Sequence, residues 1–158
     1  MNELDAAFSF IALTLTNDAT LRALPASAPI ARRWFRHVAP AIDPVTHNPM
    51  VYPVGILSHV ASRDTRGVGQ YRVLTVAQID VKVVSKAGQD VSSAVNRMDA
   101  LLDVPSQASP ITSVVVDGVT YWLLGCSRRS PLSYADPPAA DGVVYEHAGG
   151  TYDVTISR

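Results

Sequence analysis

Cys126 is the one residue in the chain with an intrinsically nucleophilic thiol, so the search for chemistry begins there. It follows the apolar run 121–125, and Arg128 and Arg129 stand close enough in sequence to lower the pKa of a neighbouring thiol. No partner residues complete a catalytic triad motif around it, and the chain has no G-x-S-x-G turn. A lone cysteine at a strand end is usually a small buried residue. We therefore expect no enzymatic activity.

Metal, acid–base and phosphate sites find little support either. The histidines do not stand at the short spacing of a local zinc site: they are His37, His47, His59 and His147. Asp99 and Asp103 lie four apart on a predicted helix, where we expect a solvated face rather than an acid–base pair. The Gly67–Gly69 segment is too short for a phosphate loop and lies between strands. The sequence thus predicts no metal and no cofactor.

Basic residues with interleaved aromatic residues form the first candidate interaction site. Arg32, Arg33 and Arg36 surround Trp34 and Phe35. Arginine and tryptophan dominate the energetics of protein interfaces, so Arg33 and Trp34 could form a hot spot. An amphipathic turn whose aromatic rings pack on the core explains the same pattern equally well. Both interpretations stay open at this point.

Two predicted loops supply the remaining candidate interface residues. Arg63, Asp64 and Arg66 fall in a polar, glycine-containing loop over residues 62–70. Arg128, Arg129 and Tyr134 fall in a second long loop over residues 127–142, which also carries two aspartates. Charges of both signs favour salt-bridged contacts with a protein over phosphate binding. We expect both loops to contact partner proteins.

Composition restricts the class of protein further. The chain has 158 residues, a length that fits one domain over residues 1–158. Hydrophobic residues make up 47% and charged residues 17%, with a net charge of −1, which gives no global reason to bind nucleic acid or an anionic membrane. The acidic start and the lack of a long apolar run predict neither a signal peptide nor a membrane span.

Hydrophobic periodicity predicts the elements that position these residues. Three- and four-residue spacing predicts a helix over residues 2–24, with a break that separates 19–24, and a second helix over 90–102. Strands are expected at 51–60, 71–84, 111–116 and 119–125, followed by either a hairpin or one bulged strand over 143–156. Residues 25–49 form a proline-marked connection that could hold a short helix at 30–37.

This order of elements predicts an α+β fold. Short turns between consecutive strands imply a mainly antiparallel sheet of about four to five strands. Two main helices would pack on one face of it.

The same order resembles the phage tail terminator (tail completion) family. The similarity covers an N-terminal helix, a proline-flanked strand, a long strand with a following helix, an arginine-rich stretch and a glycine-led last strand. After the N-terminal helix, the proline-flanked strand corresponds to 49–55, and the long strand and its following helix to 73–84 and 90–102. The arginine-rich stretch corresponds to 125–131 and the last strand to 149–154. The connection over 25–49 is long for that family and reads as an insertion.

The resemblance implies a structural role in a virion assembled in the host cytoplasm. Such proteins form a homo-oligomeric ring, typically hexameric, that caps the tail tube at its head-proximal end. Its partners are the tail tube protein and the head–tail connector, and DNA passes through the lumen without specific binding. Alternatives are another head–tail connector or neck ring subunit, or a small-ligand-binding domain built around Trp34 and His37. The particle fraction that contains the protein would distinguish a terminator from a connector subunit. A thermal shift with metals or nucleotides would identify a ligand-binding domain.

Overall fold

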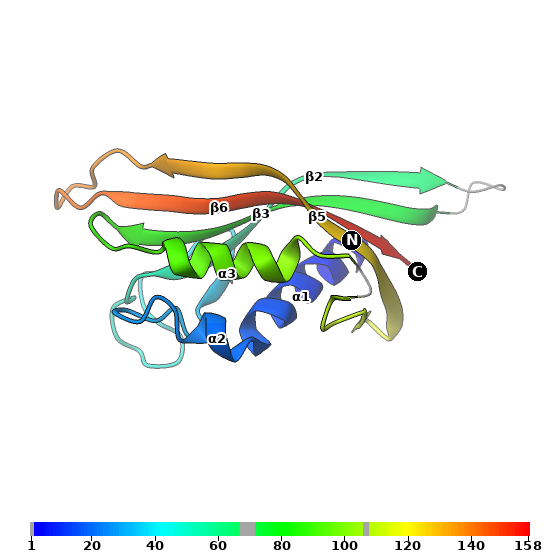
Figure 1. Cartoon of the computed structure of the whole chain (residues 1–158), viewed down its shortest axis with the longest axis horizontal. Coiled ribbons are helices and arrows are strands. Elements are labelled where there is room, and N and C mark those ends of the chain that lie inside the picture. Colours follow the sequence, from blue (N-terminus) through cyan, green and yellow to red (C-terminus); the bar gives the residue numbers. More distant parts are fainter. Residues whose placement is uncertain (1, 67–71, 106–107) are drawn as a thin grey trace.

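The computed structural model describes residues 2–66, 72–105 and 108–158. A six-stranded sheet dominates it, and the strands follow the order β1-β2-β3-β6-β5-β4 (Figure 1). The strands are β1 (Trp34–Arg36), β2 (Val54–Arg66), β3 (Arg72–Lys86), β4 (Ser113–Val116), β5 (Val119–Ala135) and β6 (Tyr145–Ser157). The helices are α1 (Asn2–Asn17), α2 (Ala19–Arg22) and α3 (Ser92–Leu102).

The expected fold class was wrong in strand number, sheet type and helix content. The sheet has six strands and is mixed, because β1 pairs parallel to β2 while the other pairs are antiparallel. It curls into a half-barrel, and the helices are short, with 16, 4 and 11 residues. The extra strand is β1, and it forms within residues 30–37, where the sequence was compatible with a short helix. β1 pairs with residues 55–57 of β2, and the flanking residues Arg33 and His37 form backbone hydrogen bonds with Gly55 and Leu57.

Two strands extend well beyond the predicted bounds. β2 continues through Arg66, so Arg63, Asp64 and Arg66 lie on a strand rather than in a loop. β5 continues through Ala135, and it contains Arg128, Arg129 and Tyr134. Residues 67–70, the rest of the first predicted loop, lie outside the described part of the chain. The segment over 143–156 forms one long strand, β6, rather than a hairpin.

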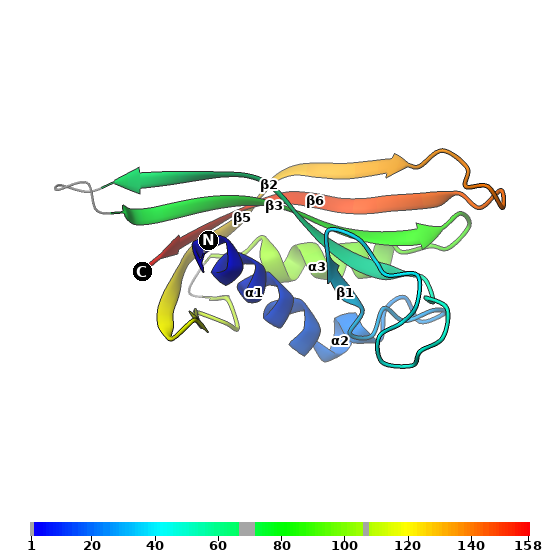
Figure 2. The ribbon, with the colours of Figure 1, turned by 180° about the vertical axis from the view of Figure 1, so that it is seen from behind.

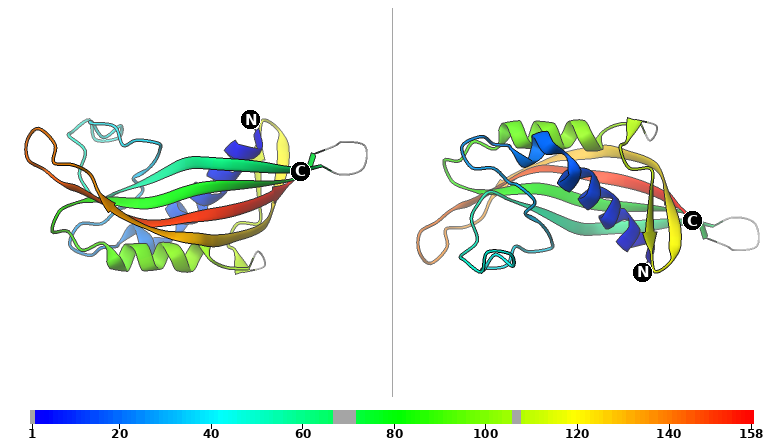
Figure 3. Two further views of the ribbon diagram at one scale, coloured as in Figure 1. Left: turned by 90° about the horizontal axis from the view of Figure 1, so that it is seen from above. Right: turned by 90° about the horizontal axis from the view of Figure 1, so that it is seen from below.

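The helices cover one face of the sheet and leave the other face open (Figures 1 and 3). Apolar residues of α1 and α3 pack against alternate residues of the central strands, which follows from the period of 3.6 in helices and of 2 in strands. The core includes Phe8, Ile11, Met98, Ile79 and Tyr152. A second, smaller cluster gathers Met50, Val54, Ile56 and Val84.

Local sequence signals explain where several elements begin and turn. Asp18 caps α2 by accepting a hydrogen bond from the Leu21 amide at 2.6 Å. Asp117 and Gly118 have φ values of 50° and 76°, as a two-residue turn between β4 and β5 requires. Asp90 accepts a hydrogen bond from the Ser92 amide at 2.9 Å, at the residue where α3 begins.

Candidate assembly surface

Two long strands leave one side of their backbone without a neighbouring strand. β1 pairs with β2 only at residues 55–57, so within the described residues no strand covers β2 from Ser58 to Arg66 (Figure 2). On the far side of the sheet, β4 pairs with β5 only at residues 119–122. The segment 103–104 then contacts β5 at Cys126 and Arg128. From Arg129 to Ala135, no described strand pairs with the side of β5 that faces away from β6. We call these segments the β2 edge (58–66) and the β5 edge (129–135).

The direction of the free backbone groups follows from the hydrogen bonds at each edge. The Asp136 amide donates to the Tyr145 carbonyl at 2.9 Å, toward β6. Since amides alternate along an antiparallel strand, those of Ala135 and Ser133 point away from β6. Pro131 occupies the next outward position, where its missing N–H costs the sheet nothing. The β5 edge therefore offers outward amides and carbonyls at alternate residues.

The β2 edge also turns backbone groups outward near its start, and the pairing of β2 with β3 shifts register between His59 and Ala61 and again between Thr65 and Arg66. The Gly55 amide donates to the Arg33 carbonyl at 2.7 Å, and the Leu57 carbonyl accepts from the His37 amide at 2.8 Å. Both groups point away from β3, so the same alternation turns the backbone of His59 outward, beyond the end of β1. Residues Val60–Arg66 are exposed along their whole length. Such an open edge is a ready template for pairing with another chain.

The face of the sheet opposite the helices is polar along its middle. Arg129 donates to Asp153 at 3.4 Å, and Thr151 donates to Asp80 at 2.6 Å. Arg63 and Arg129 line one hollow of about 180 Å³ together with Gln78 and Asp153. The structure thus brings together two predicted interface residues that are far apart in the sequence. Both arginines face the same solvent-filled hollow.

Arg128 and Asp64 point to the other side of the sheet. Arg128 donates to Asp99 of α3 at 2.8 Å, and its own amide donates to Asp103 at 2.9 Å. The two aspartates expected on a solvated face therefore hold β5 against α3. Asp64 accepts from the buried Thr75 hydroxyl at 2.8 Å. Arg66 is the last described residue of β2 and is exposed.

Tyr134 belongs to a cluster at the end of β5. Its ring stacks on His147 with a centroid separation of 4.3 Å, and Lys82 donates to its hydroxyl at 2.6 Å. His147 Nε2 lies 2.8 Å from an Asp136 carboxylate oxygen. The cluster fixes the base of the loop that joins β5 to β6.

The aromatic residues near the start of the sheet pack on the core, which favours the second of the two interpretations of that segment. The Trp34 ring lies over Gly55, where any added Cβ would come within 2.1 Å of it. Phe35 packs against the smaller hydrophobic cluster. Arg33 donates to the carbonyls of Pro29 and Ile30.

An exposed apolar patch, which sequence reasoning missed, lies on β4 and β5. Val115, Trp122 and Leu124 are 67%, 53% and 50% exposed. Trp122 and Val115 share the open face, because Val115 pairs with Thr120, two residues before Trp122. The alternation of exposed Trp122 and Leu124 with buried Tyr121 and Leu123 was the signal that could have identified it. Such patches are common at protein–protein contacts.

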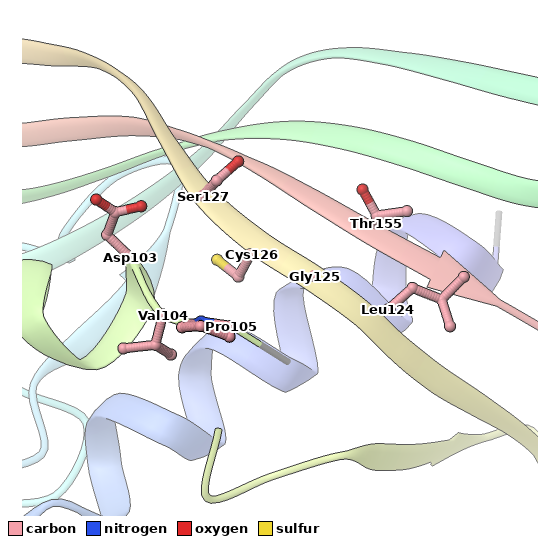
Figure 4. Close-up of a pocket in the computed structure, with 8 residues that line it drawn as sticks. All are labelled: Asp103, Val104, Pro105, Leu124, Gly125, Cys126, Ser127 and Thr155. Carbon is pink, nitrogen blue, oxygen red and sulfur yellow. The ribbon is translucent and has the colours of Figure 1, made fainter. Parts of the chain in front are cut away.

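Cys126 does not offer a reactive thiol. It lies beside a hollow of about 500 Å³ at the segment 103–105 (Figure 4). Burial, together with the nearby carboxylates of Asp103 and Asp153, raises the pKa of the Cys126 thiol to about 12. A thiol with so high a pKa is protonated at neutral pH and is a poor nucleophile.

The described ranges contain neither a metal site nor a membrane-spanning helix. No cluster of three or more histidine, cysteine, aspartate or glutamate side chains there could hold a metal ion. No described helix is both long and apolar enough to cross a bilayer.

Comparison with known proteins adds no assignment. No sequence profile of a protein family matches the chain, and no curated protein matches it.

Proposed function

We propose that this protein is a structural subunit that closes into a homo-oligomeric ring, and that the ring is a phage tail terminator. The observation that carries the proposal is the pair of free edges on opposite sides of the sheet. A long exposed edge is a liability for a chain that remains alone, and proteins usually cover or shorten such edges. Here both edges are long.

The strand directions favour head-to-tail pairing of identical copies. Between the two edges the long strands follow the order β2-β3-β6-β5, and each runs antiparallel to the next. β2 and β5 are therefore antiparallel to each other. The β5 edge of one copy can then continue the alternation on the β2 edge of the next. A contact between two different surfaces repeats around a ring if the rotation closes.

The remaining surfaces suit a ring that joins other proteins. The polar open face with Arg63 and Arg129 would stay in contact with water in the assembled ring, which suits a lumen that DNA crosses without specific readout. The patch of Val115, Trp122 and Leu124 would offer an apolar contact to the tail tube or to the connector. The tail terminator role itself rests on the resemblance in element order and on the notion that rings of this kind are built by shape complementarity.

A proline substitution at the β5 edge tests the proposal. Ser133→Pro removes an outward amide and introduces a ring that a neighbouring strand must avoid, while the bonds to β6 are kept. We expect wild-type protein to elute as an oligomer and Ser133→Pro to shift toward the single-chain mass of 16.9 kDa by light scattering. Ser133→Ala is the matched control, because it keeps the amide.

Partner fractions then test the tail role. Purified protein should bind the end of tail tubes and fix their length, and the proline variant should fail to do so. Wild-type protein that stays monomeric both alone and with tubes would contradict the ring. Binding to head connectors without any binding to tubes would favour the alternative neck-subunit role.

A further inference from the structure

A basic groove lies beside β1, and the edge pairing proposed above gives it an occupant. The groove encloses about 710 Å³ between the end of α2, the segment before β1 and the turn over residues 43–46. Its apolar lining includes Phe35, Pro44 and Val45, and its charged lining includes Arg22, Arg32 and Arg33. The groove is therefore lined by three arginines as well as by apolar side chains.

Few of these positive charges are balanced within the chain. Asp43 is the one carboxylate at the groove, and it accepts hydrogen bonds from the amides of Val45 at 2.8 Å and Thr46 at 3.2 Å. Arg32 is exposed, and no described residue forms an ion pair or hydrogen bond with its side chain. The Nε of Arg22 is buried without an acceptor among the described residues. The groove therefore suits a segment in which acidic side chains stand among small apolar residues.

The loop between β5 and β6 has that composition. Residues 136–142 read Asp-Pro-Pro-Ala-Ala-Asp-Gly, with no basic residue. Two backbone hydrogen bonds order the loop. The Ala139 amide donates to the Val143 carbonyl at 2.9 Å, and the Gly142 amide donates to the Ala139 carbonyl at 2.8 Å. Asp136 is held by His147, whereas Asp141 is exposed and bonds only to the backbone amide of Val143 within the described chain. Asp141 is therefore free to meet a partner's arginine.

The edge pairing brings this loop of one copy to the groove of the next. β5 runs antiparallel to β2, so Ala135 at the end of one copy's β5 would lie near Ser58 of its neighbour. Beyond that point β1 occupies the neighbour's β2 at residues 55–57. The chain leaving β5 must then pass over β1, where Arg33 and Phe35 open the groove. Figures 1 and 2 place the β5–β6 loop and the 25–53 connection at the same end of the molecule.

We propose that the 136–142 loop of one copy docks in this groove of the adjacent copy, with Asp141 paired to Arg32. The inference rests on the proposed ring. It gives the long 25–49 connection a role, since this segment builds most of the groove. Backbone pairing alone does not strongly determine which residues of the two edges lie opposite each other. An ion pair between the loop and the groove would fix this register.

Charge reversal in the full-length chain tests the docking. Arg32→Glu and Asp141→Arg should each weaken association by about tenfold or more, because each places like charges together. The double variant R32E/D141R should recover association to within about threefold of wild type, because every contact in a ring then has the swapped pair. Arg32→Lys keeps the charge, and Arg158→Glu reverses a charge outside the groove, so both serve as controls. The readout is the dissociation constant from sedimentation.

The outcomes separate this inference from the proposed function. If wild type forms rings and both single reversals associate normally, the docking is wrong and the ring stands. If each single variant weakens association but the double variant does not recover it, the pairing of Asp141 with Arg32 is wrong. If Arg32→Glu loses only the binding of tubes or connectors, the groove holds a different protein. Wild-type chains that never associate would overturn the ring and the docking together.

Discussion

Asp99 joins three elements through its two carboxylate oxygens. It lies on α3, its Oδ1 accepts from the Tyr152 hydroxyl of β6 at 2.7 Å, and its Oδ2 accepts from Arg128 of β5 at 2.8 Å. Tyr152 is fully buried, and burial together with the bond to Asp99 raises the pKa of its hydroxyl. The hydroxyl therefore stays protonated and donates. This arrangement ties a helix to the central strands at their middle.

Replacing Asp99 should measure what that tie contributes. Asp99→Ala leaves the buried Tyr152 hydroxyl without an acceptor, so we expect the free energy of unfolding to fall by about 1–3 kcal/mol. Asp99→Asn keeps an acceptor oxygen and should cost less. Urea titration of the three proteins provides the comparison. An alanine variant within about 0.5 kcal/mol of wild type would show that the bond contributes little.

For single residues, the sequence identified the candidate interface only in part. It pointed to Arg63 and Arg129 as loop residues that contact partner proteins, and the structure places both on strands, at one hollow. It could not distinguish them from Arg128, because a one-residue bulge between Arg128 and Ser130 decides which arginine faces α3. The register of strand pairing depends on the neighbouring strand, so the residues of the segment alone do not predict it.

Gly149 lies at the centre of β6, where strand packing leaves no space for a side chain. A Cβ at this position would come within 2.1 Å of the Val81 carbonyl oxygen of β3. The neighbouring atom is backbone, so it cannot move away cheaply. We expect Gly149→Ala to destabilise the protein by about 1–3 kcal/mol. Gly125→Ala is the matched control, since a Cβ at Gly125 would have no atom within 4 Å, and it should be neutral or slightly stabilising. Thermal melts of the two variants should differ clearly, and equal melting temperatures would contradict the close approach.

Asp18 links two helices, and its ionisation should make stability depend on pH. It caps α2, and Arg97 of α3 donates to both of its carboxylate oxygens at 3.1 and 2.6 Å. The hydrogen bond from Arg97, followed by that from the Leu21 amide, lowers the pKa of Asp18 below 3.8. A lowered folded-state pKa stabilises the protein above the unfolded pKa, and this contribution disappears as the pH falls through the folded value.

An Asp18 series therefore has a defined pH signature. At pH 7 we expect Asp18→Ala to lose about 1–2 kcal/mol, as is usual for a helix cap. The difference between wild type and Asp18→Asn should shrink as the pH falls from about 4 toward 2, because the wild-type carboxylate is then being protonated. Denaturant melts at several pH values provide the measurement. A difference that stays constant with pH would show that the charge of Asp18 has no part in stability.

The elements with one buried face were predictable, and those with two exposed faces were not. The spacing of apolar residues predicted α1, α3 and β3 closely, and the Asp117–Gly118 turn placed the hairpin of β4 and β5. The second halves of β2 and β5 are exposed on both faces, so they lack the alternation that predicts a strand. They form strands because β3 and β6 supply hydrogen-bonding partners. β1 was missed for a related reason, since three residues are too short to show any period.

At the scale of the whole molecule, the same two poorly patterned segments are the ones that leave the sheet open. A solitary chain gains little from strands that bury neither face, and it carries the association risk of their free edges. The proposed pairing of the β5 edge with the β2 edge of another copy would remove both edges at once. The proposed docking of the 136–142 loop then fixes which residues meet. One repeated contact between copies would therefore explain the exposed halves, the open edges and the long connection.

A cryo-electron microscopy map of the purified oligomer tests this account most directly. We predict a closed ring in which residues 129–135 of each copy lie antiparallel to the β2 edge of the next, so that one sheet runs continuously around the ring. A ring whose copies meet through α1 or α3, with both sheet edges still open to solvent, would contradict it.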